Sequence, residues 1–375
     1  MQFIDLQAQF ERIEKDVISR IETVLRSQKY IFGPEVFELE AKLAEFVRVK
    51  YAFSCSSGTD ALVIPLMSFE LCTTDAVFVP SFTFFASAES ITLAGGTPVF
   101  VDSEPLTFNI CPDSLRQAIE KTINEGKLNP KGIIAVDLFG CPADYDALRL
   151  IAKEYGLFLI EDAAQSFGAK YKGKRTGNFG DVAATSFFPA KPLGCYGDGG
   201  AIFTNNDDLA QLITSIRVHG QGSDKYDNVR IGLNGRLDTI QAAVLLSKLT
   251  IFEGEISERN RVAAAYTGRL SDTLTIQAVP DGSCSVWAQY TILTENEKIR
   301  ARIIERLREQ GIPTALYYPT PIHLSTAYQS LGYRKGDFPV CEELAGKVLS
   351  LPMHPYLSES EIEIITSIIK ECYEK

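Results

Sequence analysis

The sequence predicts an α/β protein with a large domain built on a mostly parallel sheet and a smaller C-terminal α+β domain. Short apolar runs alternate with helical patterns through the first two thirds of the chain. Glycine-rich and polar motifs directly follow several of these runs, as at the carboxyl ends of parallel strands. Near residue 250 the pattern changes to a helix-rich α+β unit, so we expect domains at 1–250 and 251–375.

Composition narrows the class of protein. The 375 residues are 45% hydrophobic and 23% charged, which is typical of a soluble globular chain. A net charge of −11 argues against a nucleic-acid-binding protein, which usually has a basic face. No apolar run is long enough to span a membrane. Neither the 8 cysteines nor the 3 histidines have metal-ligand or redox spacing, and no signal-peptide pattern is present, so we expect a reduced cytoplasmic protein without a metal site.

The first elements are helices. Apolar residues at helical spacing predict an amphipathic helix over 10–25, and a second over 31–47 that begins after the Gly33–Pro34 break. Both are expected to serve packing.

A small-residue turn, Ser56 to Thr59, then opens a helix within 54–69. Free backbone N–H groups and the helix dipole at such a turn form an anion site. A simple helix cap is the alternative.

The remaining pattern alternates regularly. Strands are predicted at 76–80, 97–103, 132–140, 158–163, 183–188 and 201–205, and helices at 112–123 and 144–156. Beyond 250 we expect helices at 255–270 and 297–311, a strand at 285–294, a proline-rich loop at 312–329, and helices over 341–355 and 360–375.

An acid and a lysine stand at the ends of two of these strands. The run Phe158 to Ile160 ends in Glu161 and Asp162, and Lys191 follows the strand at 183–188. Two such groups can meet at one crevice of the sheet. Pyridoxal phosphate (PLP) needs this pair, because an amine holds its aldehyde as a Schiff base and a carboxylate keeps its pyridine nitrogen protonated. Taken singly, Asp162 as a helix cap and Lys191 as a solvated loop residue are the alternatives.

Three motifs in this region, EDAAQSFGA, SFFPAKPLG and YGDGGA, resemble those of the DegT/DnrJ/EryC1/StrS sugar aminotransferases. The resemblance implies the fold of PLP-dependent aspartate aminotransferases, called fold type I, with a seven-stranded sheet. It implies that Lys191 is the Schiff-base lysine and moves the proton. It further implies Asp162 at the pyridine nitrogen, Gln165 near the ring and Ser186 at the phosphate.

Two further blocks carry the same likeness. SGTDAL resembles the family's GTDAL motif and implies phosphate contacts from Gly58 and Thr59, and PSFTFFASAE implies an aromatic ring against the pyridine face. Phe84 best matches that ring, with Phe82 and Phe85 as rivals that fit the core equally well. GLNGRLDTIQAA resembles GxNxRxxxxQAA, which implies that Asn234 reaches the phosphate of a neighbouring subunit in a homodimer.

The resemblance implies a ping-pong transaminase that moves an amino group from L-glutamate to a nucleotide-linked keto-sugar. It is strongest to enzymes that aminate C3 of UDP-2-acetamido-2-deoxy-3-oxo-glucuronate for O-antigen synthesis. A uronate carboxylate needs a cation, for which Arg230 and Arg236 are candidates. The family's YYPxPxH segment faces the substrate and implicates Tyr317, Tyr318 and His323. A surface or dimer role is the alternative for the two arginines, and packing in a proline-rich loop is the alternative for the other three residues.

Other functions fit the same fold. A 3-keto- or 4-keto-6-deoxy sugar nucleotide is the alternative substrate, and a non-catalytic, regulatory or dehydratase member of the family is the alternative function. Family dehydratases carry histidine at the lysine position, so Lys191 favours transamination. GCYGDGG lacks the GxGxxG order of a dinucleotide site.

Overall fold

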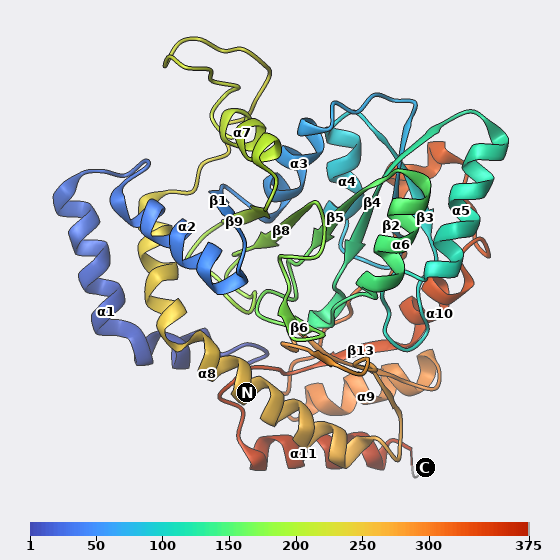
Figure 1. Ribbon diagram of the computed structural model, residues 1–375. Coiled ribbons are helices and arrows are strands. Elements are labelled where there is room, and N and C mark those ends of the chain that lie inside the picture. Colours follow the sequence, from blue (N-terminus) through green and yellow to red (C-terminus); the bar gives the residue numbers. More distant parts are fainter. Residues whose placement is uncertain (374–375) are drawn as a thin grey trace.

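A seven-stranded sheet with helices on both faces forms the centre of the computed structural model, which describes residues 1–373 (Figure 1). Its strand order is β1-β9-β8-β5-β4-β2-β3, and β9 alone runs antiparallel to its neighbours. The strands are β1 (Tyr51–Cys55), β2 (Asp75–Pro80), β3 (Thr97–Val101), β4 (Asn129–Val136), β5 (Phe158–Asp162), β8 (Val182–Ser186) and β9 (Gly200–Thr204). The expected mostly parallel seven-stranded sheet is confirmed.

Burial on both faces explains why the strands read as continuous apolar runs. In β2, Val77 and Val79 pack with residues of α3 (Gly58–Ser68) and α4 (Ala86–Leu93). Ala76 and Phe78 face the other way and pack with residues of α5 (Pro112–Glu125) and α6 (Tyr145–Tyr155). Such two-sided burial is typical of parallel sheets covered by crossover helices.

The N-terminal helices lie along one end of the sheet. Helix α1 (Leu6–Ser27) packs Ile13 and Val17 against Val244 of the long helix α8 (Thr239–Leu270). Helix α2 (Pro34–Val47) begins at the predicted Gly33–Pro34 break, and α7 (Asp207–Ile216) follows β9.

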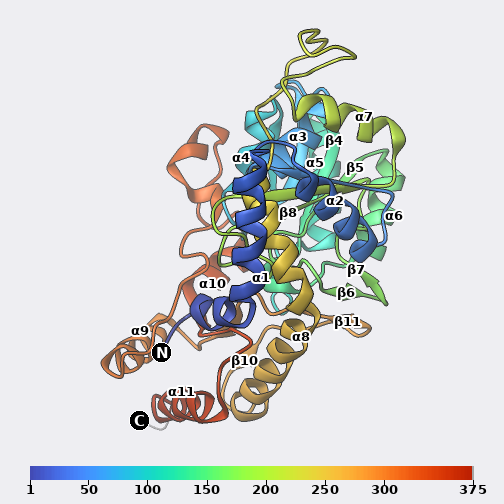
Figure 2. The same ribbon diagram turned by 90° about the vertical axis from the view of Figure 1, so that its left-hand side faces the viewer.

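The C-terminal part contains a separate antiparallel sheet. Its strands are β10 (Thr275–Ile276), β12 (Tyr290–Leu293) and β13 (Val348–Leu351), with α9 (Glu297–Glu309) and α11 (Glu359–Glu371) packed nearby. Helix α8 continues through the expected boundary at 250/251 (Figure 2). The division into two domains stays a prediction.

Several local expectations differ from the structure. Segment 341–355 does not form one helix, because Val348–Leu351 pairs with β12 after α10 (Pro339–Lys347) ends. Strand β1 and the small sheet of β6 (Lys170–Tyr171), β7 (Lys174–Arg175) and β11 (Ser283–Cys284) were not predicted. The last expected helix ends at Glu371, and its positions 374–375 lie outside the described residues. Across residues 1–373, no helix combines the length and apolar character needed to cross a membrane.

Candidate active site

The predicted site residues collect at the carboxyl edge of the central sheet. Asp162 is the last residue of β5, and Ser186 is the last residue of β8. Gly58 begins α3 just beyond β1, and Phe84 lies in the turn between β2 and α4. The crossover topology therefore brings together residues from four separate parts of the sequence.

Lys191 lies in the loop that follows β8. Its backbone N–H donates to the carbonyl of Phe188 at 2.8 Å, which closes a tight turn. Within residues 1–373, none of the hydrogen bonds or ion pairs engages its side-chain amine. Burial lowers the pKa of this amine, and the nearby charge of Asp162 opposes that shift in part. The site thus holds an amine that can shed its proton more readily than a surface lysine.

Asp162 is the acid that faces Lys191. Its carboxylate is 4% exposed and accepts hydrogen bonds from Ser87 Oγ at 2.8 Å and from the backbone N–H of Ala164 at 3.2 Å. Burial raises the pKa of Asp162, while Ser87, Ala164 and the charge of Lys191 lower it. Burial outweighs these partners, so the pKa of Asp162 lies above its usual value, and the three partners limit that rise.

Glu161, the other acid of the predicted pair, points to the opposite face of β5. Its carboxylate accepts hydrogen bonds from the backbone N–H groups of Gly177 and Phe179, the latter at 2.8 Å. Because side chains alternate along a strand, only one of two consecutive acids can face the crevice. Glu161 therefore anchors the loop at 177–179.

The N-terminus of α3 and the end of β8 meet closely enough to form an anion cradle. A Cβ atom added at Gly58 would lie 2.6 Å from Ser186 Cβ and 2.8 Å from Ser186 Oγ. Ser57 caps the helix, with its side chain accepting from the backbone N–H of Asp60 at 3.0 Å. Free helix N–H groups next to a serine hydroxyl suit a phosphate, so this part of the site fits the phosphate of PLP.

Phe84 is the solvent-exposed aromatic residue among the three candidates in this segment. It is 54% exposed, whereas Phe82 is 1% exposed and Phe85 packs against Tyr328 in the core. The Phe84 ring centroid lies 6.0 Å from that of Tyr318. Of the three rivals, Phe84 alone leaves a ring face for a ligand.

Gln165 links the edge of the sheet to the C-terminal part. Its Oε1 accepts from the backbone N–H of Phe139 at 2.8 Å, and its Nε2 donates to Tyr318 Oη at 3.3 Å. Tyr317 lies in the same loop as Tyr318, and their ring centroids are 5.8 Å apart. The structure thus brings Tyr317 and Tyr318 to the site.

His323 lies in the core. It is 1% exposed, its Nδ1 lies 2.6 Å from Ser81 Oγ, and its Nε2 lies 3.2 Å from Glu342 Oε1. Both ring nitrogens are occupied by protein groups. The structure therefore favours a packing role for His323, and we do not include it among the proposed substrate-binding residues.

Asn234, Arg230 and Arg236 belong to the segment between α7 and α8, part of which projects from the body in both views (Figures 1 and 2). Asn234 is exposed, and Arg230 Nη1 donates to Ser215 Oγ at 2.5 Å. The Nε of Arg236 is buried without a hydrogen-bond partner. Among the described residues of one protomer, no contact joins these three to Lys191.

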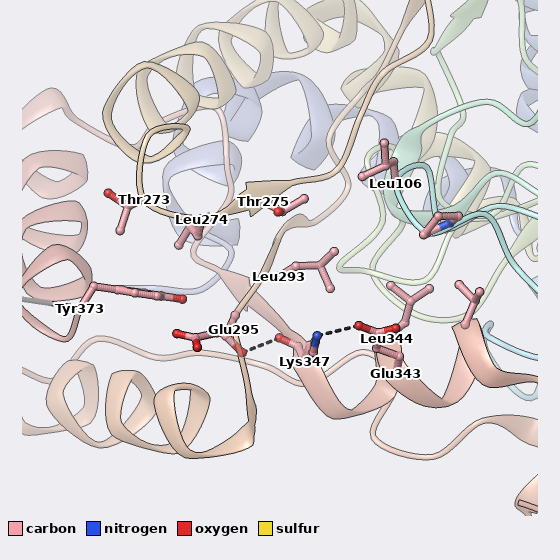
Figure 3. Close-up of a pocket in the computed structure, with 13 residues that line it drawn as sticks. Leu106, Thr273, Leu274, Thr275, Leu293, Glu295, Glu343, Leu344, Lys347 and Tyr373 are labelled. Atoms are coloured by element: carbon pink, nitrogen blue, oxygen red, sulfur yellow. Dashed lines mark hydrogen bonds and ion pairs between the residues drawn. The ribbon is translucent and has the colours of Figure 1, made fainter. Parts of the chain in front are cut away.

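A cavity of about 510 Å³ lies elsewhere, between β12, α10 and the end of α8 (Figure 3). Its lining includes Leu106, Leu293 and Tyr373, and the ion pair of Lys347 and Glu343 at 2.6 Å. None of the predicted site residues lines it, so this cavity does not mark the candidate site.

Two buried groups near Asp162 were missed by sequence reasoning. Ser87 looks like one of several small residues in ASAES, and only the fold places its hydroxyl on Asp162. Asp137 directly follows β4 at the carboxyl edge of the sheet, a position that could have marked it as a candidate. Its carboxylate accepts from Tyr145 Oη and Ser166 Oγ, both at 2.7 Å, and burial raises its pKa to about 7.

The comparisons with known proteins agree with this geometry. Residues 11–370 match the DegT/DnrJ/EryC1/StrS aminotransferase family. The UDP-2-acetamido-2-deoxy-3-oxo-D-glucuronate aminotransferase of Pseudomonas aeruginosa is 47% identical over 370 residues, which cover 98% of this chain and 99% of that protein. The crystal structure of a DegT DnrJ EryC1 StrS aminotransferase from Brucella abortus is 51% identical, with a TM-score of 0.97 and 100% of both chains covered. NtdA from Bacillus subtilis, with bound cofactor PMP, is 27% identical, with a TM-score of 0.89 and coverage of 100% of this chain and 83% of that one.

Proposed function

Because the chain belongs to the DegT/DnrJ/EryC1/StrS aminotransferase family, we propose that it transfers an amino group from L-glutamate to C3 of UDP-2-acetamido-2-deoxy-3-oxo-glucuronate. The chain is a PLP-dependent sugar aminotransferase. Its product serves O-antigen or a related surface polysaccharide.

The observation that carries the proposal is that the buried Lys191 amine and the buried Asp162 carboxylate lie at one edge of the sheet and interact electrostatically. When bound, PLP supplies an electron sink that stabilises the negative charge left on a substrate carbon after its proton is removed. The cofactor needs an amine on one side and an anion at its ring nitrogen. Among the site residues, these two side chains match those needs.

Lys191 carries and moves the proton. Burial lowers the pKa of its amine, so the neutral form that accepts a proton is more accessible than at a surface lysine. The same amine would hold the cofactor between turnovers. A single residue therefore performs both tasks, first as an anchor and then as a base.

Asp162 and the anion cradle hold the two ends of the cofactor. An ionised Asp162 favours a protonated ring nitrogen. Gly58, Thr59 and Ser186 would hold the phosphate through helix N–H groups and a hydroxyl, and Phe84 would cover a ring face. Gln165, fixed by its hydrogen bond to the backbone of Phe139, would lie near the ring.

Asn234 completes the phosphate site of a second copy of this chain. The segment that carries it also exposes Tyr226 (86%), Ile231 (83%) and Val229 (52%), a set of apolar side chains that suits burial against another subunit. In a homodimer, each site would then use Lys191 of one chain and Asn234 of the other.

Mixing two inactive variants tests this arrangement. Lys191→Ala and Asn234→Ala should each lose most activity. When equal amounts are dissociated and reassembled, half of the dimers are mixed and each has one intact site, so about a quarter of the wild-type activity should return. Mixed dimers without recovered activity would show that Asn234 acts within its own chain.

The cation for the uronate carboxylate is proposed to be Arg236, with Arg230 as the second candidate. Arg236 has a buried Nε without a partner, and such a group is costly unless a ligand or another subunit satisfies it. The high identity to the P. aeruginosa enzyme supports a uronate substrate.

Two keto-sugar nucleotides that differ only at C6 test the substrate. The form with a C6 carboxylate should be aminated, and the 6-deoxy form should react at least about tenfold more slowly, because a charged hydrogen bond is lost. A preference for the 6-deoxy sugar would move the assignment to the alternative substrate class.

Cofactor attachment tests the enzyme class. Incubation with PLP followed by borohydride should add one reduced cofactor to the peptide containing Lys191. The variant Lys191→Ala should fold, take no covalent cofactor and produce no 2-oxoglutarate from glutamate. A label on another lysine would refute the assignment of Lys191.

A further inference from the structure

We propose that Ser87 is a positioning residue that keeps the carboxylate of Asp162 ionised and in a single orientation, an inference that rests on the proposed function. The proposal deepens the description of the cofactor site. It assigns a role to a side chain that the sequence motifs leave unassigned.

The geometry begins in the first turn of α4, where Ser87 is the second residue and follows the turn that carries Phe84. Ser87 is 2% exposed, and its Oγ donates to Asp162 Oδ2 at 2.8 Å. Its backbone N–H donates to the carbonyl of Phe84 at 3.2 Å. This short segment therefore presents both the open aromatic ring and the hydroxyl that holds the acid. Thr83 Oγ1 lies 3.3 Å from Ser87 Oγ, within hydrogen-bond distance.

The surroundings of Asp162 explain why it needs such a donor. Burial favours its neutral form, and among the groups that oppose burial the hydrogen bond from Ser87 lowers the pKa of Asp162 most, ahead of Ala164 and Lys191. The buried carboxyl of Asp137, from the end of β4, and the hydroxyl of Tyr318 are coupled electrostatically to Asp162. A carboxylate among these groups stays charged only if donors satisfy it.

Ser90 offers a matched control on the same helix. It is fully buried, and its Oγ donates to the backbone carbonyl of Ser87 at 3.2 Å without touching Asp162. Ser90→Ala therefore removes a buried hydroxyl from α4 and leaves the acid's partners in place. Ser87→Thr keeps the hydroxyl and serves as the conservative variant.

The experiment measures PLP binding to the full-length protein from pH 5 to 9, by the absorbance of bound cofactor and without substrate. For Ser87→Ala we expect the dissociation constant at neutral pH to rise about tenfold, the effect of losing one hydrogen bond to a charged group. The acid limb of binding should move up by about one pH unit, because Asp162 then protonates more easily. Ser87→Thr should restore both values, and Ser90→Ala should change neither.

The outcomes separate this proposal from the proposed function. If the wild type does not attach PLP to Lys191, the proposed function is refuted. If the wild type binds PLP and Ser87→Ala has the same binding profile as the wild type, only the role of Ser87 is refuted. Equal losses in Ser87→Ala and Ser90→Ala would also overturn it, because they indicate general packing damage. If Ser87→Ala does not fold, Ser87→Cys, a much weaker donor, replaces it, and an unchanged affinity and acid limb would count against the proposal in the same way.

Discussion

Replacing Gly58 with alanine tests the anion cradle directly. The new Cβ would lie 2.6 Å from Ser186 Cβ, whereas ordinary contacts begin at 3.4 Å, so the two segments must separate by 3.4 − 2.6 = 0.8 Å along this line. Ser186 cannot simply rotate away, because its Cβ is bonded to the backbone of β8, which is paired with Gly200 of β9. The strain must therefore open the gap between α3 and β8.

The expected magnitude follows from this separation. A hydrogen bond of about 2.9 Å that lengthens by 0.8 Å passes beyond the useful range. Losing one bond to a charged phosphate costs about 1.5–3 kcal/mol, which corresponds to about 10-fold to 100-fold weaker PLP binding. Lys191 and Asp162 are untouched, so covalent attachment at high PLP concentration should persist.

PLP titration, followed by absorbance, measures this change. Gly254→Ala is the control, because Gly254 lies in α8 with nothing within 4 Å of an added Cβ. It should leave PLP affinity unchanged and stabilise the fold by up to about 1 kcal/mol, the helix-propensity difference between glycine and alanine. If Gly58→Ala binds PLP as tightly as the wild type, the phosphate does not occupy this cradle.

Three other changes give distinct outcomes. Lys191→Arg should keep the positive charge yet abolish turnover and covalent labelling, because a guanidinium does not deprotonate; residual transamination in a product assay would contradict the role. Burial raises the pKa of Asp137 to about 7 in the folded protein, whereas an unfolded chain has a pKa near 4 for this group. Because the folded state holds the proton more tightly, the free energy of unfolding should fall as pH rises from about 4 to 7. Asp137→Asn should flatten that fall in urea unfolding at pH 5 and 7.5, and an unchanged slope would exclude Asp137 as its source. Tyr318→Phe should lower kcat/KM for the sugar nucleotide about fivefold while PLP affinity stays within about twofold; the reverse pattern would assign the hydroxyl to the cofactor.

Much of the sheet could be predicted because its strands are buried on both faces and read as apolar runs. Strands β2 to β5 and the motifs that follow them lie where the pattern placed them. β1 was missed because Tyr51–Cys55 leads directly into a serine-rich turn, and the polar Ser54 makes its end read as part of that turn. The split of 341–355 was missed because Val348–Leu351 has an apolar character that suits a helix face and a paired strand equally.

The site was predictable where the chemistry lies in a contiguous motif. The positions of Asp162, Lys191 and the α3 cap at the carboxyl edge of the sheet follow from local sequence, because each directly follows a recognisable strand or opens a helix. The burial of His323 depends on Ser81 and Glu342, which are distant in sequence, so no local pattern could show that its ring nitrogens are taken. Ser87 is hidden for the same reason, since its partner lies 75 residues away.

Helix α8 has a mechanical consequence for the whole chain. It runs unbroken from Thr239, beside the segment that bears Asn234, to Leu270 in the C-terminal core. Bending it midway would break several backbone hydrogen bonds at about 1 kcal/mol each. The helix therefore resists bending between the central sheet and the C-terminal part. Access to the site is more easily controlled by loops, such as the one with Tyr317 and Tyr318, than by rotation of the C-terminal third.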